Sequence, residues 1–97
     1  MAHGIRWSPG AVSGFEAICN HIARDSPFYA GLFAKKIDAI VTGLAQFPRA
    51  GRVVPEYGDE AIRERIYQNY RIVYRLKRGT IEIVAITHGA RPLRESE

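Results

Sequence analysis

The sequence predicts an α+β domain in which a helical hairpin packs on one face of a small, mainly antiparallel sheet. Two helix-start signals, Ser8-Pro9 and Ser26-Pro27, stand close together. In each, the serine suits the N-cap and the proline suits the first helical position. Three alternating segments follow in the second half, separated by two-residue turns. The predicted order is β-α-α-β-β-β, and the 97 residues suffice for a single domain over residues 1–97.

The helices are predicted over residues 9–24 and 26–46, because apolar residues recur there at three- and four-residue spacing. The first stripe consists of Val12, Phe15, Cys19 and Ile22, and the second of Tyr29, Phe33, Ile37, Ile40, Leu44 and Phe47. Neither helix can bury its stripe alone, so both should pack on a sheet. The residues expected to be buried are Phe15, Ile22, Phe33, Ile37, Ile40 and Leu44. Cys19 is expected to fill space in the core rather than to act as a nucleophile.

Strands are predicted at residues 5–7, 62–67, 70–77 and 80–88, with a loop rich in glycine and proline before the second of them. In the third strand, alternation places Tyr70, Ile72, Tyr74 and Leu76 on one side and Arg71, Val73, Arg75 and Lys77 on the other. Such a strand could present a cationic binding surface, or its arginines could simply be a solvated sheet face. In the last strand, Ile81, Ile83 and Ala85 should share one side, with Val84 and Ile86 on the other. A strand that is apolar on both sides is expected in the interior of the sheet.

The composition is that of an ordinary soluble globular domain, with 46% hydrophobic and 25% charged residues. No apolar run approaches the ~20 residues that span a bilayer, and no secretory signal is evident at the N-terminus. A single cysteine and the lack of a Cys/His metal spacing favour a reducing cytoplasm, with no metal site. Ten of the fourteen lysines and arginines fall in residues 49–97. This basic half permits a nucleic-acid or acidic-protein partner without selecting either.

Taken together, a set of short motifs resembles the RelE/ParE superfamily of bacterial toxins, from type II toxin–antitoxin (plasmid stabilisation) systems. The motifs are Trp7-Ser8-Pro9, Asp25-Ser26-Pro27, Phe47-Pro48, Gly51-Arg52, Val54-Pro55-Glu56, Arg63-Glu64, Tyr70-Arg71-Ile72-Val73-Tyr74-Arg75 and His88-Gly89-Ala90-Arg91. Each fragment alone is weak. Their order and spacing over nearly the whole chain make the resemblance fairly specific.

The resemblance implies a toxin that a cognate antitoxin neutralises, either ParD-like or RelB-like, in a heterotetramer or larger complex. RelE-like members cleave mRNA on the ribosome, whereas ParE-like members share the fold and poison DNA gyrase. The segment from Gly51 to Glu56 and the His88-Gly89 pair are more similar to the ParE branch. Neither activity requires a cofactor.

For the ribonuclease branch, the resemblance implies that Arg71 holds the phosphate, that Glu56 is the base and that His88 is near the position of the acid. His88 stands about one residue out of place, however, and the lysine cluster of typical ribosomal members is missing. Antitoxin or target binding is expected at Arg63, Arg65, Arg71, Arg75 and Arg91. The simpler alternatives are that these arginines pair with Glu64 and Glu82 across strands, and that His88 is structural.

A third hypothesis does not depend on the resemblance to a known family. The chain could be a small basic module that binds nucleic acid through its sheet, with exposed aromatic residues among the arginines for base stacking. Tyr67 and Tyr70 are the candidates. Steeply salt-dependent binding of DNA or RNA would support this hypothesis.

Overall fold

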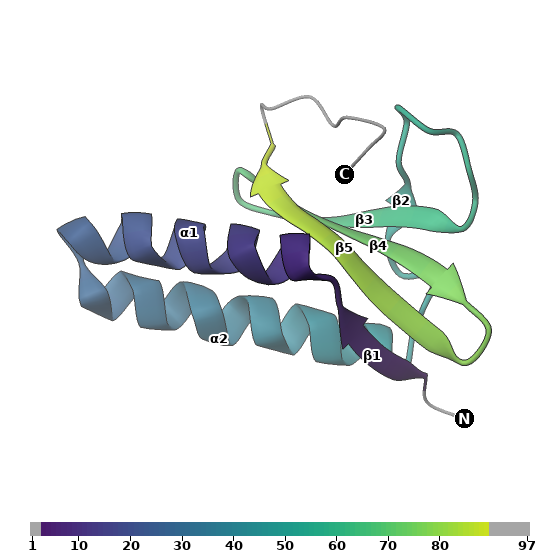
Figure 1. Cartoon of the computed structure of the whole chain (residues 1–97), viewed down its shortest axis with the longest axis horizontal. Coiled ribbons are helices and arrows are strands. Elements are labelled where there is room, and N and C mark those ends of the chain that lie inside the picture. Colours follow the sequence, from purple (N-terminus) through teal and green to yellow (C-terminus); the bar gives the residue numbers. More distant parts are fainter. Residues whose placement is uncertain (1–2, 90–97) are drawn as a thin grey trace.

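The computed structural model describes residues 3–89, and in them a helical hairpin covers one face of a five-stranded sheet (Figure 1). The elements are β1 (Gly4–Trp7), α1 (Pro9–Asp25), α2 (Pro27–Leu44), β2 (Arg52–Val53), β3 (Ile62–Tyr67), β4 (Tyr70–Lys77) and β5 (Thr80–His88). The strand order is β1-β5-β4-β3-β2. The predicted fold class and element order are confirmed, and β2 is an additional short strand in the segment that was expected to be a loop.

Both predicted helix starts are confirmed by their hydrogen bonds. The Ser8 hydroxyl accepts from the Ala11 amide at 3.0 Å, and the Ser26 hydroxyl accepts from the Tyr29 amide at 3.2 Å. Each serine thereby satisfies one of the amide groups that the first turn of a helix leaves unpaired. Since Ser26 also closes α1 through its own amide, the two helices follow one another without a loop.

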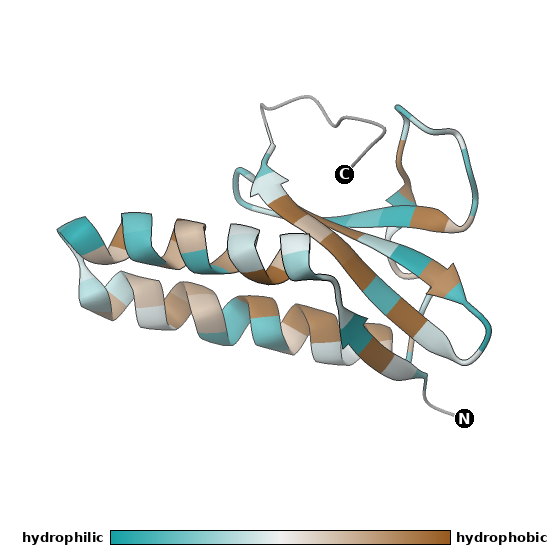
Figure 2. Cartoon of the chain, viewed as in Figure 1, coloured by the Kyte–Doolittle hydropathy of each residue, from teal (hydrophilic) through white to brown (hydrophobic). Residues whose placement is uncertain are grey.

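The sheet is an antiparallel meander of β3, β4 and β5, to which the two short strands add at the edges. β2 pairs with β3 in antiparallel fashion, whereas β1 runs parallel to β5. β5 is therefore an interior strand over its first half, as its apolar character predicts. Figure 2 shows it as hydrophobic over most of its length.

The main core lies between the helices and the sheet. Phe33, Ile37 and Leu44 are buried there as predicted, together with sheet residues such as Ile72 and Tyr74. Phe15, Ile22 and Ile40 are only half-buried at its margin.

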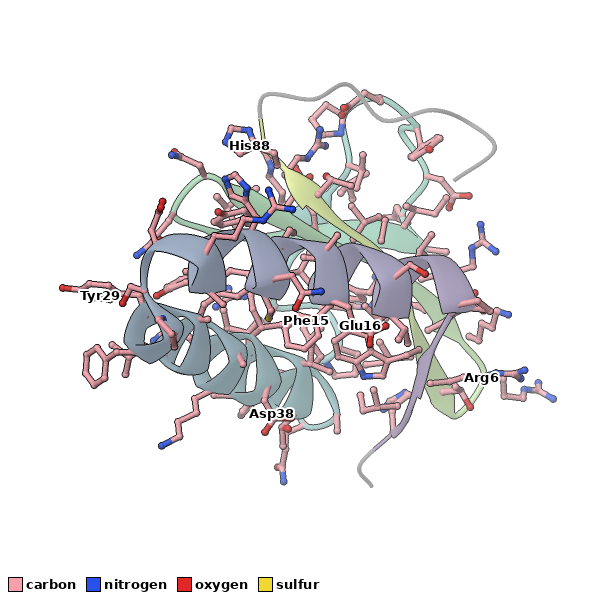
Figure 3. The ribbon with its side chains drawn as sticks, turned by 60° about the vertical axis from the view of Figure 1, so that its left-hand side comes forward. Arg6, Phe15, Glu16, Tyr29, Asp38 and His88 are labelled. Carbon is pink, nitrogen blue, oxygen red and sulfur yellow. The ribbon has the colours of Figure 1, made fainter. Side chains whose placement is uncertain are left out.

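Three members of the predicted stripes are exposed instead: Val12 (41%), Tyr29 (63%) and Phe47 (70%). For Tyr29 the reason is that the far end of the hairpin projects beyond the sheet, where nothing covers it (Figures 1 and 3). Phe47 leaves the stripe because α2 ends at Leu44, short of the predicted residue 46.

A β-bulge breaks the predicted alternation of β5. Val73 lies opposite Ala85, yet the next residue of β4, Tyr74, lies opposite Ile83. Val84 is therefore an extra residue, and every side chain after it changes face. Its carbonyl accepts a hydrogen bond from the Ser8 hydroxyl at 3.0 Å.

The prediction for the end of β5 was therefore wrong, because Ile86, not Ala85, joins the main core. Ala85 instead packs with Val54 and Val73 in a second, small apolar cluster. This cluster lies on the sheet face opposite the helices, which we call the outer face.

Among residues 3–89, no helix is long and apolar enough to cross a membrane.

Candidate functional site

A four-residue ionic cluster on the outer face is centred on Arg71, in β4. The Arg71 Nε donates to Glu64 at 2.6 Å, and its two terminal nitrogens donate to the two carboxylate oxygens of Glu56 at 2.7 and 2.9 Å. The second oxygen of Glu64 accepts from the Nε of Arg52 at 2.7 Å. Arg71 thus binds both Glu56 and Glu64, and Glu64 in turn binds both Arg71 and Arg52.

The cluster is assembled from three neighbouring elements. Glu64 comes from β3, where it lies opposite Val73, and Arg71 lies two residues before Val73 in β4, on the same face. Arg52 begins β2, directly across from Glu64. Glu56 comes from the turn after β2, in which the amides of Tyr57 and Gly58 both donate to the Val54 carbonyl. This turn brings Glu56 over the sheet.

Electrostatically, the cluster compensates its own charge. The Arg71 side chain is 9% exposed and that of Glu64 is 0% exposed, and buried charges of this kind are tolerated only when they are paired. The hydrogen bonds to Glu56 and Glu64 hold the pKa of Arg71 above its ordinary value, despite the opposing effect of burial. With two arginines and two glutamates, the cluster has no formal net charge. Arg71 is therefore not a free cation that awaits a phosphate.

The three residues that the ribonuclease reading requires do lie around one cavity. It has a volume of about 380 Å³, and its lining residues include Glu56, Arg71 and His88. His88 lies at the end of β5 (Figure 3), where its ring meets the edge of Tyr70 with the centroids 5.8 Å apart. The cavity therefore places a histidine near the cluster, but Glu56 is already a bidentate partner of Arg71.

Of the other predicted arginines within residues 3–89, only Arg75 shares the outer face with Arg71. Arg75 lies on the outer face, where its terminal nitrogen is 3.8 Å from Glu82. Arg63 and Arg65 lie opposite Tyr74 and Ile72, on the face that the helices cover. Arg91 lies outside the described residues. The strand surface expected to be cationic is thus largely neutralised by Glu56, Glu64 and Glu82.

The aromatic residues proposed for base stacking are engaged elsewhere. Tyr67 and Tyr70 both contact the Phe33 ring, at centroid distances of 6.2 and 4.9 Å. They belong to the helix side of the sheet, so they do not lie among the outer-face arginines. In the part of the chain that the structure describes, no three His, Cys, Asp or Glu side chains are grouped so as to hold a metal ion.

A larger cavity of about 830 Å³ lies between α1 and β5. Small residues of α1 line it, including Gly10, Gly14 and Ala17. A side-chain carbon at Gly14 would come within 2.7 Å of the Ile86 carbonyl oxygen, so glycine allows this close approach of helix and strand. The cavity is mostly apolar, although His21, Glu82 and His88 also line it.

The alternative that the strand arginines pair with Glu64 and Glu82 holds for Arg71 and Arg75, but sequence reasoning missed the role of Tyr74. The Tyr74 hydroxyl donates to the Pro48 carbonyl at 2.7 Å and accepts from the Gly51 amide at 2.9 Å. It thereby fixes the segment between α2 and β2. In β3, alternation places Glu64 on the opposite face from Arg63 and Arg65. This was the available signal that Glu64 lies on the same face as Arg71.

The sequence and the structure were compared with those of known proteins. Residues 5–93 match the family described as the ParE toxin of the type II toxin–antitoxin system parDE. The chain belongs to the ParE toxin family. No curated protein sequence shows a significant match.

Two solved structures show how widely the fold is shared. A chain of the chromosomal ParDE system from P. aeruginosa superposes with a TM-score of 0.73 at 21% identity, over 90% of this chain and 96% of that one. A chain of the RelBE2 toxin–antitoxin complex from Mycobacterium tuberculosis gives 0.64 at 16% identity, over 94% of this chain and 95% of that one. The predicted membership of the RelE/ParE superfamily is confirmed, and the family match supports the ParE-like branch.

Proposed function

We propose that this ParE-family toxin inhibits DNA gyrase in the cytoplasm by binding, with none of its side chains acting as a chemical catalyst. The observation that carries the proposal is the neutralised state of Arg71. Metal-free cleavage of RNA requires a general base for the 2′-hydroxyl and a cation for the phosphate. Here the residue expected to be the base and the residue expected to be the cation are hydrogen-bonded to each other.

Glu64 strengthens this argument. A phosphate that approached Arg71 would have to displace Glu56 and would still meet the buried carboxylate of Glu64, 2.6 Å from the Arg71 Nε. Like charges at that range repel strongly in a site of low exposure. A ribosomal ribonuclease therefore remains the second candidate, supported only by the shared cavity of Glu56, Arg71 and His88.

Neutralisation by an antitoxin is the second part of the proposal. The similar structures come from toxin–antitoxin systems, ParDE and RelBE2, and we infer a ParD-like partner in a heterotetramer or larger complex. Exposed apolar side chains on the projecting hairpin, Phe28, Tyr29 and Leu32, fit a protein that is normally partnered. Cells that express the toxin without any antitoxin should stop growing, and normal growth would contradict the toxin assignment.

Expression in cells tests the target. If gyrase is inhibited, the cells should form filaments and induce the DNA-damage response while translation continues. If the toxin is a ribonuclease, translation should stop first, and ribosome-bound mRNA should carry cuts that disappear with Arg71→Ala. The second pattern would overturn the proposal.

A further inference from the structure

A second group of basic residues lies around the segment that joins α2 to β2. We call Arg49, Arg63 and Arg65 the arginine cluster. The Arg63 side chain is held by the carbonyls of Glu60 at 2.9 Å and Gly51 at 3.0 Å. That of Arg65 reaches the Ala50 carbonyl at 3.5 Å. Two of the three guanidiniums are therefore positioned by backbone groups rather than by carboxylates.

Tyr74 shows that the three arginines converge. Burial raises the pKa of its hydroxyl, whereas the Gly51 amide and the positive charges of Arg63, Arg65 and Arg49 act in the opposite direction. The hydrogen bonds agree with this: the Tyr74 hydroxyl binds Pro48 and Gly51, and Arg63 and Arg65 donate to the carbonyls of Gly51 and Ala50. Arg49 lies in the same segment, between Pro48 and Ala50. The cluster is thus built around the point where Tyr74 anchors the segment.

The arginine cluster differs from the Arg71 cluster in its charge balance. Among residues 3–89, no carboxylate forms an ion pair with Arg49, Arg63 or Arg65. Arg71, by contrast, is saturated by two glutamates. Within residues 3–89, the arginine cluster thus retains positive charge that no carboxylate pairs with, whereas the Arg71 cluster does not.

An apolar cavity adjoins the arginine cluster. Its volume is about 730 Å³, and its lining residues include Phe47, Pro48, Arg49 and Leu76. Phe47 is 70% exposed at this cavity, an unusual position for a phenylalanine unless a partner covers it. Arg49 belongs to both the cavity and the cluster, so the two surfaces are continuous.

We propose that this surface binds an extended acidic segment of the antitoxin, with an apolar side chain in the cavity against Phe47 and carboxylates on the arginine cluster. The identity of the partner rests on the proposed function; the chemistry rests on the surface itself. Arginine forks suit carboxylates and phosphates equally well. The adjoining apolar cavity favours a polypeptide, because a peptide can insert an apolar side chain there, whereas the backbone of duplex DNA has no protruding apolar side chain.

The test is direct binding to the purified full-length protein. The probe is a synthetic peptide in which leucine and phenylalanine residues precede a run of glutamates, and matched probes are the same peptide with glutamine for glutamate and a short DNA duplex. Amide chemical shifts should change mainly at residues 46–51 and 63–65. The glutamine peptide and the duplex should bind more weakly than the acidic peptide.

Substitutions in the arginine cluster and at Phe47 test whether these residues bind the peptide. The double variant Arg63→Gln/Arg65→Gln should weaken the binding of the acidic peptide by roughly 2- to 30-fold, the range expected for two exposed ion pairs. The control Arg6→Gln/Arg24→Gln removes two exposed arginines of β1 and α1 that do not line this surface, and it should leave binding unchanged. Phe47→Ala should also weaken binding without unfolding the protein, because its side chain is largely exposed.

Several results would overturn the inference: equal binding by the double variant and its control, equal binding of the glutamine peptide, or tighter binding of the duplex at the cluster. Circular dichroism of each variant separates lost binding from lost folding. The assay contains neither gyrase nor cells, so its failure would leave the gyrase proposal standing. Conversely, a toxin without effect on gyrase could still bind the peptide.

Discussion

Replacing Glu64 by glutamine should destabilise the protein by about 3 kcal/mol, because the change leaves Arg71 buried beside a neutral group. Removing one partner of a buried ion pair typically costs about 3–5 kcal/mol. Arg71 keeps its bidentate bond to Glu56, and Arg52 is 65% exposed and can be solvated. Both facts place the expected cost at the lower end of that range.

The assay is urea unfolding, with the free energy extrapolated linearly to water. Glu82→Gln is the matched control, since Glu82 pairs with Arg75 at 3.8 Å and Lys77 at 3.3 Å, and both of these side chains are nearly half exposed. Such pairs contribute at most about 1 kcal/mol. If Glu64→Gln costs no more than Glu82→Gln, the outer-face cluster is not a tightly paired buried network, and the argument against a free Arg71 fails.

A double variant, Glu64→Leu with Arg71→Met, separates charge from packing. Apolar residues of similar size often replace a buried ion pair at little net cost. The double variant should therefore be clearly more stable than Glu64→Gln. A double variant as unstable as the single one would mean that the volume of these side chains, rather than the pairing of their charges, determines stability at this position.

Three further predictions follow from packing and titration. Phe33→Ala should cost about 3–5 kcal/mol in the same assay and Tyr29→Ala less than about 0.5 kcal/mol, since Phe33 is buried and Tyr29 is exposed; equal costs would contradict the assigned core. Gly51→Ala should destabilise by about 1–3 kcal/mol, because the new carbon would lie 2.5 Å from the Glu64 carbonyl oxygen. Gly31→Ala, in open space on α2, should instead stabilise by up to about 1 kcal/mol. Burial raises the pKa of Tyr74, so the folded state holds this proton more tightly than the unfolded state. Stability should therefore fall as pH rises above about 10, the ordinary pKa of tyrosine. Tyr74→Phe should remove this fall in stability at high pH. The same variant should cost about 1–3 kcal/mol, because it leaves the Gly51 amide and the Pro48 carbonyl without their partner.

Local signals in the sequence predicted the fold well. The two serine caps defined the hairpin, and the turns at residues 68–69 and 78–79 defined the meander. Gly79 indeed has a positive φ of 69°, which glycine adopts without strain. The alternation of β5 after Val84 could not be predicted, because no turn or breaker residue in the strand marks the bulge. The Val84 carbonyl there accepts from the Ser8 hydroxyl, a partner 76 residues away in the chain.

The site was harder to predict than the fold. Sequence alternation grouped the residues of β3 and β4 correctly, but it could not show which arginines would pair with carboxylates. For Arg71 the sequence left open a ligand or a cross-strand carboxylate, and the structure shows two carboxylates; the printed partners of Arg63 and Arg65, on the other face, are carbonyls. The pairing with Glu56 depends on the path of the turn after β2, which the sequence did not specify.

Supercoiling by purified gyrase in the presence of the toxin tests the central claim most directly, with Glu56→Gln and His88→Ala as the variants. If the toxin acts by binding, the parent protein should inhibit supercoiling, and both variants should inhibit it equally well, because neither a base nor an acid is required. A parallel ribosome assay should show no mRNA cleavage. The account would be contradicted if the parent left gyrase unaffected but cut ribosome-bound mRNA, with a loss of about 10²–10⁴ in rate on Glu56→Gln, the scale expected for a general base.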